Sequence, residues 1–414
     1  MKSFHVITLG CPKNQVDSEI LAGVCLEAGL RFRKDPHRAD LLVLNTCAFI
    51  EPAVEESLEK LGELLDWKAA GGGRHVVLAG CLPGRYSDDG SGGLEEIDLV
   101  IGPGEHQRLA RWLGAENPLP RQNGAGVFRY VKIAEGCSNR CSYCTIPAIR
   151  GAFIPIDAAC VVDSVNTVVG QGAREVGLVA QDSGAHPELT RIVERVTGLH
   201  PGVWFRLYYV HPSHFPDDLP GLLESRHNLA PYLDLPIQHA SAPVLERMGR
   251  GYGPDRLSRI MDTIEGLSRP VAVRFTVITG YPGETDRDFH CLERFLGRYP
   301  SLRHIAAFPW WPEEGTREYE RAARQRDAVP GHETMERLSA LSSLGESIYH
   351  SWAERLSGKR FPVMADTSLT GHSCYDAPDA DLQATFINPV VPGSVVMCSL
   401  VSGSGSEMVV DKAE

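Results

Sequence analysis

The sequence lacks features that would place it in several large classes of protein. It contains no run of about 18 apolar residues, the length that a membrane-spanning helix requires. The first residues, MKSFHVITLGC, lack the small-residue cleavage pattern of a secretory signal peptide and lead into Pro12 and Lys13. We therefore interpret this stretch as a strand, and we expect a cytoplasmic protein with no membrane partner.

Basic residues are fewer than acidic ones. Lys and Arg number 41 against 53 Asp and Glu, so the formal net charge is -12. The negative electrostatic potential of such a chain opposes binding to a polyanion, although a local basic patch can still bind RNA. The balance favours a protein or peptide partner over a nucleic acid. The 414 residues are enough for two or three domains with large cores.

Cysteine is present in an informative pattern. Eleven cysteines without a secretory signal indicate metal or redox chemistry in a reducing compartment, not a disulfide framework. Cys137, Cys141 and Cys144 have the spacing CxxxCxxC, so three thiolates can converge on one inorganic centre. A closed zinc site needs four protein ligands, whereas a 4Fe-4S cluster on three thiolates leaves one iron open to a substrate or cofactor. A zinc loop that takes a fourth ligand from elsewhere is the alternative.

Residues 1–120 predict an open parallel α/β sheet domain. The apolar runs HVITL, LLVLN and HVVLAG alternate with stretches of helical periodicity. Cys11, Cys47 and Cys81 follow these three strands. Because ligands bind at the carboxyl ends of the strands in such sheets, we predict a second three-thiolate site there. The alternative is that these cysteines are small buried apolar side chains, which is how we interpret Cys25.

Residues 127–356 predict a partial (β/α)6 barrel, after a linker rich in Pro, Gly and Asn at 116–126. Its expected strands are FRYVKI, EVGLVA, WFRLYYV, YLDLPI, VRFTVI and HIAAF. The CxxxCxxC loop follows the first strand, at the end of the barrel where a site would lie. In GYPGET we expect Thr285 to be a helix N-cap, with Asp288 completing a capping box. We interpret His239 as a hydrogen-bonded structural residue.

Residues 358–414 predict a small β-barrel. Short β-prone pieces, RFPVMA, ATFINPVV, SVVMCSLV and EMVVD, are separated by Gly, Pro and Ser. Acidic residues outnumber basic ones here, which disfavours a nonspecific RNA-binding module. A module that docks on a protein fits this balance better.

The motifs together resemble those of the radical S-adenosylmethionine (SAM) methylthiotransferase family. The resemblance covers all three predicted domains: LGCPKN, NTCAFI and AGCLPGRY in the first; EGCSNRCSYCTIPAIRG, AQD, YLDLPIQHAS, GYPGET and PEEGT in the second; and YDAPDADL, which resembles a TRAM domain, in the last. Among its branches, GCPKN, NTCAFI, PIQHAS and the DAP element are most similar to RimO. That branch methylthiolates the β-carbon of an aspartate in a small-subunit ribosomal protein.

The resemblance implies an enzyme and its cofactors. The CxxxCxxC cysteines would hold a 4Fe-4S cluster that binds SAM, and the three strand-end cysteines an auxiliary 4Fe-4S cluster that carries sulfide or persulfide. By the same resemblance, one SAM would methylate that sulfur, a second would yield a 5'-deoxyadenosyl radical, and the substrate radical would receive the methylthio group. An external electron donor such as flavodoxin or ferredoxin is implied. We expect Tyr143, Gln181, Arg206 and Gln238 to line the SAM site; no catalytic side chain is assigned.

The sequence departs from the RimO pattern near the expected site. AFIPIDAAC follows IRG, SGAHPE follows AQD, and Trp310-Trp311 replaces the usual Tyr-Ser before the EEGT element. These changes leave the substrate open to alternatives: another peptide, such as a ribosomally made natural product, or a tRNA adenosine. A non-enzymatic iron–sulfur scaffold is a further alternative, which the absence of 5'-deoxyadenosine under reducing conditions would indicate.

Overall fold

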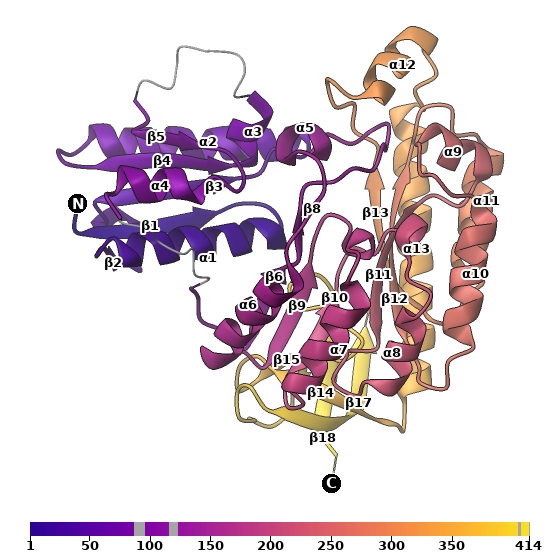
Figure 1. The fold of residues 1–414 in the computed structure, drawn as a ribbon. Coiled ribbons are helices and arrows are strands. Elements are labelled where there is room, and N and C mark those ends of the chain that lie inside the picture. Colours follow the sequence, from indigo (N-terminus) through magenta and orange to yellow (C-terminus); the bar gives the residue numbers. More distant parts are fainter. Residues whose placement is uncertain (87–95, 116–122, 405–406, 414) are drawn as a thin grey trace. The chain divides into compact units, whose positions relative to one another are not determined.

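The computed structural model describes residues 1–86, 96–115, 123–404 and 407–413 (Figure 1). The chain forms two units. The first comprises Met1–Ala125, Tyr130–Ser138 and Cys144–Gln171, and the second Gly126–Arg129, Asn139–Tyr143 and Gly172–Glu414. Most of the predicted linker, residues 116–122, lies outside the described residues. The predicted boundaries of three domains stay a prediction.

The first unit is built on a parallel sheet with the strand order β2–β1–β3–β4–β5. Its strands are β1 (Ser3–Thr8), β2 (Arg31–Phe32), β3 (Leu41–Thr46), β4 (His75–Gly80) and β5 (Leu99–Ile101). Its helices are α1 (Pro12–Glu27), η1 (Pro36–Arg38), α2 (Glu51–Ala69), α3 (Cys81–Tyr86) and α4 (His106–Trp112). The three predicted strands are β1, β3 and β4; the short β2 and β5 were not predicted.

Helices cover both faces of this sheet. On one face Leu42 and Leu44 of β3 pack with residues of α2 and α3, and on the other Leu41 and Val43 pack with residues of α1 and α4. A strand buried on both faces needs a continuous apolar run, which the LLVL sequence supplies. The predicted open α/β sheet is confirmed. The first unit also contains α5 (Ile146–Arg150), α6 (Ala158–Gly170) and the paired strands β7 (Ala134–Glu135) and β8 (Ile154–Pro155).

The second unit carries the strands of the predicted (β/α) barrel, except that Tyr130–Lys132 of its first strand belong to the first unit. They lie in the orders β6–β9–β10 and β11–β12–β13, and Figure 1 shows the connecting helices along their outer side. Hydrogen bonds join β10 to the chain entering β11, including Phe205 N–H to Asn228 O at 2.8 Å. The strands are β6 (Phe128–Lys132), β9 (Glu175–Val179), β10 (Trp204–Leu207), β11 (Tyr232–Gln238), β12 (Ala272–Thr279) and β13 (Leu302–Pro309). All six predicted strands are confirmed.

The helical elements of the second unit follow the strands in turn. They are η3 (Ser183–Ala185), α7 (Leu189–Leu199), η4 (Pro212–His214), α8 (Leu219–Ser225), α9 (Ala242–Arg247), α10 (Pro254–Glu265), α11 (Asp286–Leu296), α12 (Arg317–Gln325) and α13 (Gly331–Leu356). Thr285 caps α11 with a complete capping box through Asp288, as predicted. His239 is buried and bonded to Glu284 and to the backbone of Ser241, so its structural role is also confirmed.

The C-terminal residues form a closed five-stranded barrel in the order β14–β15–β16–β18–β17. Its strands are β14 (Arg360–Ala365), β15 (Thr370–Ser373), β16 (Gln383–Phe386), β17 (Val395–Ser404) and β18 (Glu407–Lys412). This confirms the predicted small barrel; only β15, whose sequence TGHS lacks a β pattern, was missed. Buried ion pairs attach it to the core, including Arg303 Nε to Asp376 Oδ1 at 2.7 Å.

No helix in the described part of the chain combines the length and the hydropathy needed to cross a bilayer.

Candidate functional site

The three strand-end cysteines lie together in the first unit. The Sγ atoms of Cys11 and Cys81 are each 3.8 Å from Oδ1 of Asn14. Cys47 lies so close to Gly10 that a Cβ at that position would come within 2.9 Å of the Cys47 Sγ. Gly10 also has a φ of +89°, so a side chain there would be strained as well as crowded. The glycine before Cys11 thus allows the ends of β1 and β3 to bring their thiols together.

These thiols differ in pKa because their charged neighbours differ. Burial raises the pKa of Cys47 to about 11, and it raises that of Cys81 against the opposing charge of Arg150. Burial acts upward on Cys11 too, but the charges of Lys13 and Arg150 and backbone N–H donors outweigh it, so its pKa is lowered. One buried and two partly buried thiols with cations beside them fit a soft, thiolate-binding centre such as an iron–sulfur cluster, with one position left open.

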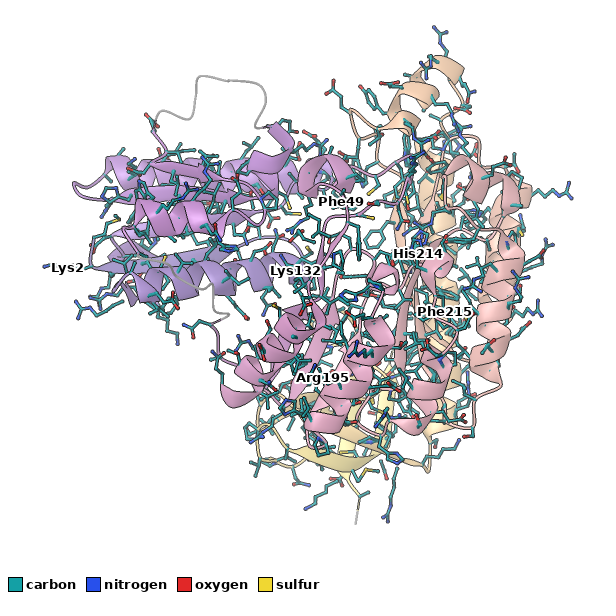
Figure 2. The ribbon with its side chains drawn as sticks, viewed as in Figure 1. Lys2, Phe49, Lys132, Arg195, His214 and Phe215 are labelled. Carbon is teal, nitrogen blue, oxygen red and sulfur yellow. The ribbon has the colours of Figure 1, made fainter. Side chains whose placement is uncertain are left out.

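Arg150 lies beside these thiols within a network of two cations and two carboxylates. Its Nη2 donates to Oδ1 of Asn14 at 2.5 Å, and its Nη1 donates to Glu135 at 2.9 Å and to Asp17 at 3.2 Å. Lys132, labelled in Figure 2, donates to the same two carboxylates. Burial acts to raise the pKa of Glu135, but the charges of Lys132 and Arg150 lower it to about 2. The charge of Arg150 is therefore balanced by protein carboxylates.

The CxxxCxxC loop begins at a turn that only glycine fits. Gly136 has a φ of +68°, and a Cβ there would lie 2.1 Å from the carbonyl oxygen of Ala152. The N–H of the next residue, Cys137, donates to Gly151 O at 3.1 Å. These contacts hold the two ends of the sequence motif EGC…IRG side by side. Cys137 and Cys144 belong to the first unit, and Cys141 belongs to the second.

The middle of this loop, residues 139–143, is held by the turn that follows α9. The N–H of Ser142 donates to Met248 O at 2.8 Å. Gly249 has a φ of +68°, and a Cβ there would come within 2.6 Å of the carbonyl oxygen of Arg140. The turn at 248–250 is therefore shaped to accept the loop that carries Cys141.

Arg250 ends this turn and directs its guanidinium at Cys141. Its Nη1 lies 3.2 Å from the Cys141 Sγ and 3.3 Å from the Tyr143 hydroxyl. Its Nε donates to the Tyr252 hydroxyl at 3.1 Å, and its Nη2 donates to the carbonyl of Pro236. The residue is 4% exposed. Within the described ranges, no carboxylate forms an ion pair with it.

Four side chains at the carboxyl ends of the strands have buried polar atoms without a hydrogen-bond partner among the described residues. They are Gln181 after β9, His211 after β10, Gln238 at the end of β11 and Trp310 after β13. An unmet buried polar group costs roughly 1–3 kcal/mol. Gln238 also has a φ of +66° at a register shift between β11 and β12, and such strain often marks binding sites. Unmet polar atoms on four strands fit a bound polar ligand.

Asp182, His211 and His214 each place a possible ligand atom within 4.8 Å of the others. His214, labelled in Figure 2, lies with its Nδ1 2.6 Å from Asp182 Oδ2. The N–H of Ser213 donates to Nδ1 of His211 at 3.2 Å, so the proton of the neutral ring is on Nε2. Burial lowers the pKa of His211 to about 3 and so keeps the ring neutral. Its Nε2–H fits a hydrogen-bond acceptor of a ligand better than a cation.

Arg206 lies away from these strand ends. Its Nε donates to Oε1 of Glu175 at 2.8 Å, its Nη1 donates to the carbonyl of Cys374 at 3.2 Å, and its guanidinium carbon is 4.8 Å from the Tyr232 ring centre. Glu175 begins β9, so it lies at the opposite end of that strand from Gln181. Arg206 therefore faces the C-terminal barrel, and we correct the expectation that it lines the SAM site.

The chain combines a parallel (β/α) core that carries a CxxxCxxC loop with an α/β sheet that gathers three thiols at its strand ends. This combination is that of a radical SAM enzyme with a second thiol site. Comparisons with protein families agree. Residues 131–296 match the family described as "Radical SAM superfamily", and residues 3–102 match "Uncharacterized protein family UPF0004". Membership of this class supports SAM and a 4Fe-4S cluster as cofactors.

Curated relatives narrow the class. The protein named "Ribosomal protein uS12 methylthiotransferase RimO" from Syntrophus aciditrophicus (strain SB) is 34% identical, over 98% of this chain and 97% of its own. Its namesake from Sorangium cellulosum (strain So ce56) is 33% identical, over 99% of this chain and 90% of its own. The chain therefore belongs to the RimO family and is a radical SAM methylthiotransferase.

Solved structures share the fold at low sequence identity. The radical SAM methyltransferase TsrM from Kitasatospora setae has a TM-score of 0.58 and 15% identity, and the match covers 78% of each chain. The cobalamin-dependent SAM radical enzyme OxsB has a TM-score of 0.53 and 11% identity, with 79% of this chain and 56% of its own covered. At these identities the likeness shows the fold alone.

Sequence reasoning missed the two arginines that lie beside the thiols. Arg150 lies near the end of the CTIPAIRG motif, and its position there did not indicate which residues it would contact. Arg250 is 109 residues from Cys141 and stands in a turn, MGRGY, without a distinctive pattern. No sequence signal pointed to either contact, because both depend on how distant segments pack.

Proposed function

We propose that this chain replaces an unactivated C–H by C–SCH3 at the β-carbon of an aspartate in ribosomal protein uS12. The observation that carries the proposal is 34% identity, over 98% of the chain, with an enzyme named for that substrate. The chain's two cysteine trios support it, because this chemistry needs both a radical source and a sulfur donor. A ribosomal substrate also supports a cytoplasmic location.

The proposed cofactor sites are assigned residue by residue. Cys137, Cys141 and Cys144 would hold the SAM-binding 4Fe-4S cluster, and Cys11, Cys47 and Cys81 an auxiliary 4Fe-4S cluster with sulfide or persulfide on its open iron. When bound, these groups supply the 5'-deoxyadenosyl radical and the methylthio group. Flavodoxin or ferredoxin is the proposed class of electron donor.

The protein's own side chains would bind and orient SAM. Gln181 and Gln238 offer amide groups with unmet polar atoms, and His211 offers an Nε2–H donor. Tyr143 places its hydroxyl beside the same arginine that contacts Cys141. Neutral donors and acceptors suit a ligand that carries both an amino and a carboxylate group. We propose Tyr143, Gln181, Gln238 and His211 as the SAM-lining set.

The substrate assignment is tested by mass spectrometry. Anaerobically reconstituted protein is incubated with SAM, dithionite, sulfide and a peptide from the aspartate-containing loop of uS12. We expect the aspartate to gain one methylthio group. A C47A variant serves as the control: it should still form 5'-deoxyadenosine but give no methylthiolated product.

A different outcome would redirect the search. Abundant 5'-deoxyadenosine with an unmodified uS12 peptide would contradict the uS12 assignment while leaving the chemistry intact. Other peptides and then tRNA would be assayed next, in that order because the net charge of -12 opposes a polyanion. Trp311 of the altered Trp310-Trp311 element and the nearby Phe308 expose 43% and 50% of their surfaces. Absence of 5'-deoxyadenosine in every assay would contradict the enzyme chemistry itself.

A further inference from the structure

Arg250 is a buried arginine without a carboxylate partner in the described part of the chain. Burying an unpaired cation is strongly unfavourable, so buried arginines normally have an anionic neighbour. Four other buried arginines each pair with at least one carboxylate; they are Arg150, Arg206, Arg303 and Arg337. Arg250 differs from these four, and the difference points to an anion that the carboxylates of the protein do not supply.

The neighbours of Arg250 identify that anion. Its donors face two tyrosine hydroxyls, the carbonyl of Pro236 and the Sγ of Cys141. A carbonyl is neutral, and burial raises the pKa of Tyr252, so that phenol stays protonated. Cys141 is different, because a cysteine that binds iron does so as a thiolate. The thiolate and the iron–sulfur cluster that it helps to hold provide the missing negative charge.

We propose that Arg250 is a positioning residue for the SAM-binding cluster: it hydrogen-bonds the Cys141 thiolate and raises the reduction potential of that cluster. The proposal rests on the proposed function in one respect, that Cys141 is a cluster ligand. It assigns to Arg250 a role that neither the family match nor the cysteine motif contains.

The sign of the effect follows from electrostatics. Reduction adds one electron from a low-potential donor of the flavodoxin or ferredoxin class to the cluster. It breaks no bond and moves no proton, so the cluster becomes more negative by one charge. A fixed cation and a hydrogen bond to a ligating sulfur both stabilise the more negative state, particularly in a site shielded from water. Removal of Arg250 should therefore make reduction harder.

The test is a redox titration followed by electron paramagnetic resonance. It uses the full chain with Cys11, Cys47 and Cys81 replaced by alanine, so that a single cluster titrates. In this background R250Q removes the charge. R269Q is the matched control, because Arg269 donates to backbone carbonyls of Leu223, Arg226 and Leu229 and contacts no cysteine of either trio.

We expect R250Q to lower the equilibrium constant for reduction at least tenfold, which is a shift of about 59 mV for one electron. Iron and sulfide content should match the parent chain, and R269Q should leave the potential unchanged. A potential in R250Q equal to that of the parent and of R269Q, or a higher one, would overturn the proposal.

A second variant covers the case in which R250Q does not fold. R250K keeps a positive charge but lacks the fork that reaches Cys141, Tyr143 and Tyr252 together. A fall in the reduction constant of about threefold would support the proposal, and an unchanged constant would overturn it. If the parent chain binds no cluster in the first place, the assignment of Cys141 as a ligand fails, which is a separate result from a cluster with an unaltered potential.

Discussion

Two buried arginines lie beside cysteines of the two trios, Arg150 beside Cys11 and Cys81 and Arg250 beside Cys141, and they differ in how their charge is balanced. In the first unit Arg150 bonds Glu135 and Asp17, and Lys132 completes a network of two positive and two negative groups. In the second unit Arg250 contacts only neutral groups and the Cys141 thiol among the described residues. The same residue type therefore meets two different electrostatic requirements.

This difference in charge balance predicts that one arginine acts on protein stability and the other on redox chemistry. A balanced arginine contributes to folding, because its loss leaves buried carboxylates without their partner. An arginine without a carboxylate has no ion pair that stabilises the fold until an anionic group binds, and its charge is then available to that group. We therefore expect Arg150 to matter chiefly for the stability of the first unit and Arg250 chiefly for the electron affinity of the cluster at Cys141.

The largest predicted effect divides the two thiol sites by function. C141A should abolish both 5'-deoxyadenosine and the methylthiolated product, because the radical source is lost. C47A should abolish only the product. The two compounds are quantified by liquid chromatography and mass spectrometry in the same reaction, with C160A as a control, since Cys160 is exposed and outside both trios. Equal loss of 5'-deoxyadenosine in C141A and C47A would remove the distinction between the sites.

The next effect concerns Arg150. R150Q should destabilise the first unit by about 3–5 kcal/mol, because it breaks a buried ion-pair network and leaves Asp17 and Glu135 dependent on Lys132. Hydrogen exchange of the β1, β3 and β4 amides measures this locally. R108Q is the control, since Arg108 pairs with Glu105 at an exposed site and should change stability by no more than about 0.5 kcal/mol. Unchanged exchange in R150Q would contradict the role of this network.

A smaller predicted effect is a pH dependence of stability, which has opposite directions in the two units. Burial acts to lower the pKa of His372, but the carboxylates of Glu175 and Asp366 raise it to about 9. Since the folded pKa lies above the ordinary 6.5, this stabilisation is complete below pH 6.5 and is lost as the pH rises through about 9. For Glu135, whose pKa is lowered to about 2, stability is instead lost as the pH falls from about 4.5 towards 2.

The measurement is hydrogen exchange of the C-terminal barrel between pH 6.5 and 9.5, corrected for intrinsic rates. The barrel should lose up to about 3 kcal/mol of protection over that range, and H372Q should abolish the dependence. H350Q, at an exposed position on α13, should retain it. A wild-type profile with the same slope as H372Q would show that the pair of His372 and Glu175 does not hold the barrel in place.

The sequence was informative where a local pattern determines the structure. The continuous apolar run at Leu41–Leu44 predicted a strand buried on both faces, and the six strands of the core and the closed barrel were found where expected. Placement of Cys11, Cys47 and Cys81 after parallel strands predicted that they meet, because parallel strands end at one edge. Periodicity and chain direction are sufficient for such inferences.

The sequence was uninformative where distant segments decide the outcome. Arg206 was assigned to the wrong end of the core, because alternation along a strand does not tell which layer of a barrel a long side chain reaches; its partner Glu175 and the Cys374 carbonyl come from other segments. Arg250 had no visible role for the same reason. The arginines near thiols required the packed structure, whereas the thiols themselves did not.

The smallest predicted effect tests whether stability and redox potential are separable. T285A removes the capping box of α11, in which Thr285 accepts from Asp288 N–H and Asp288 accepts from Thr285 N–H, and it should lower stability by about 1 kcal/mol. It removes no charge near Cys141, so the cluster potential should equal that of the parent chain, and T285S should restore stability. R250Q should show the reverse pattern, with a shifted potential and a thermal midpoint close to that of the parent. If T285A instead shifted the potential as R250Q does, loosening of the fold rather than loss of a cation would explain both, and the contrast between Arg150 and Arg250 would have no electrostatic basis.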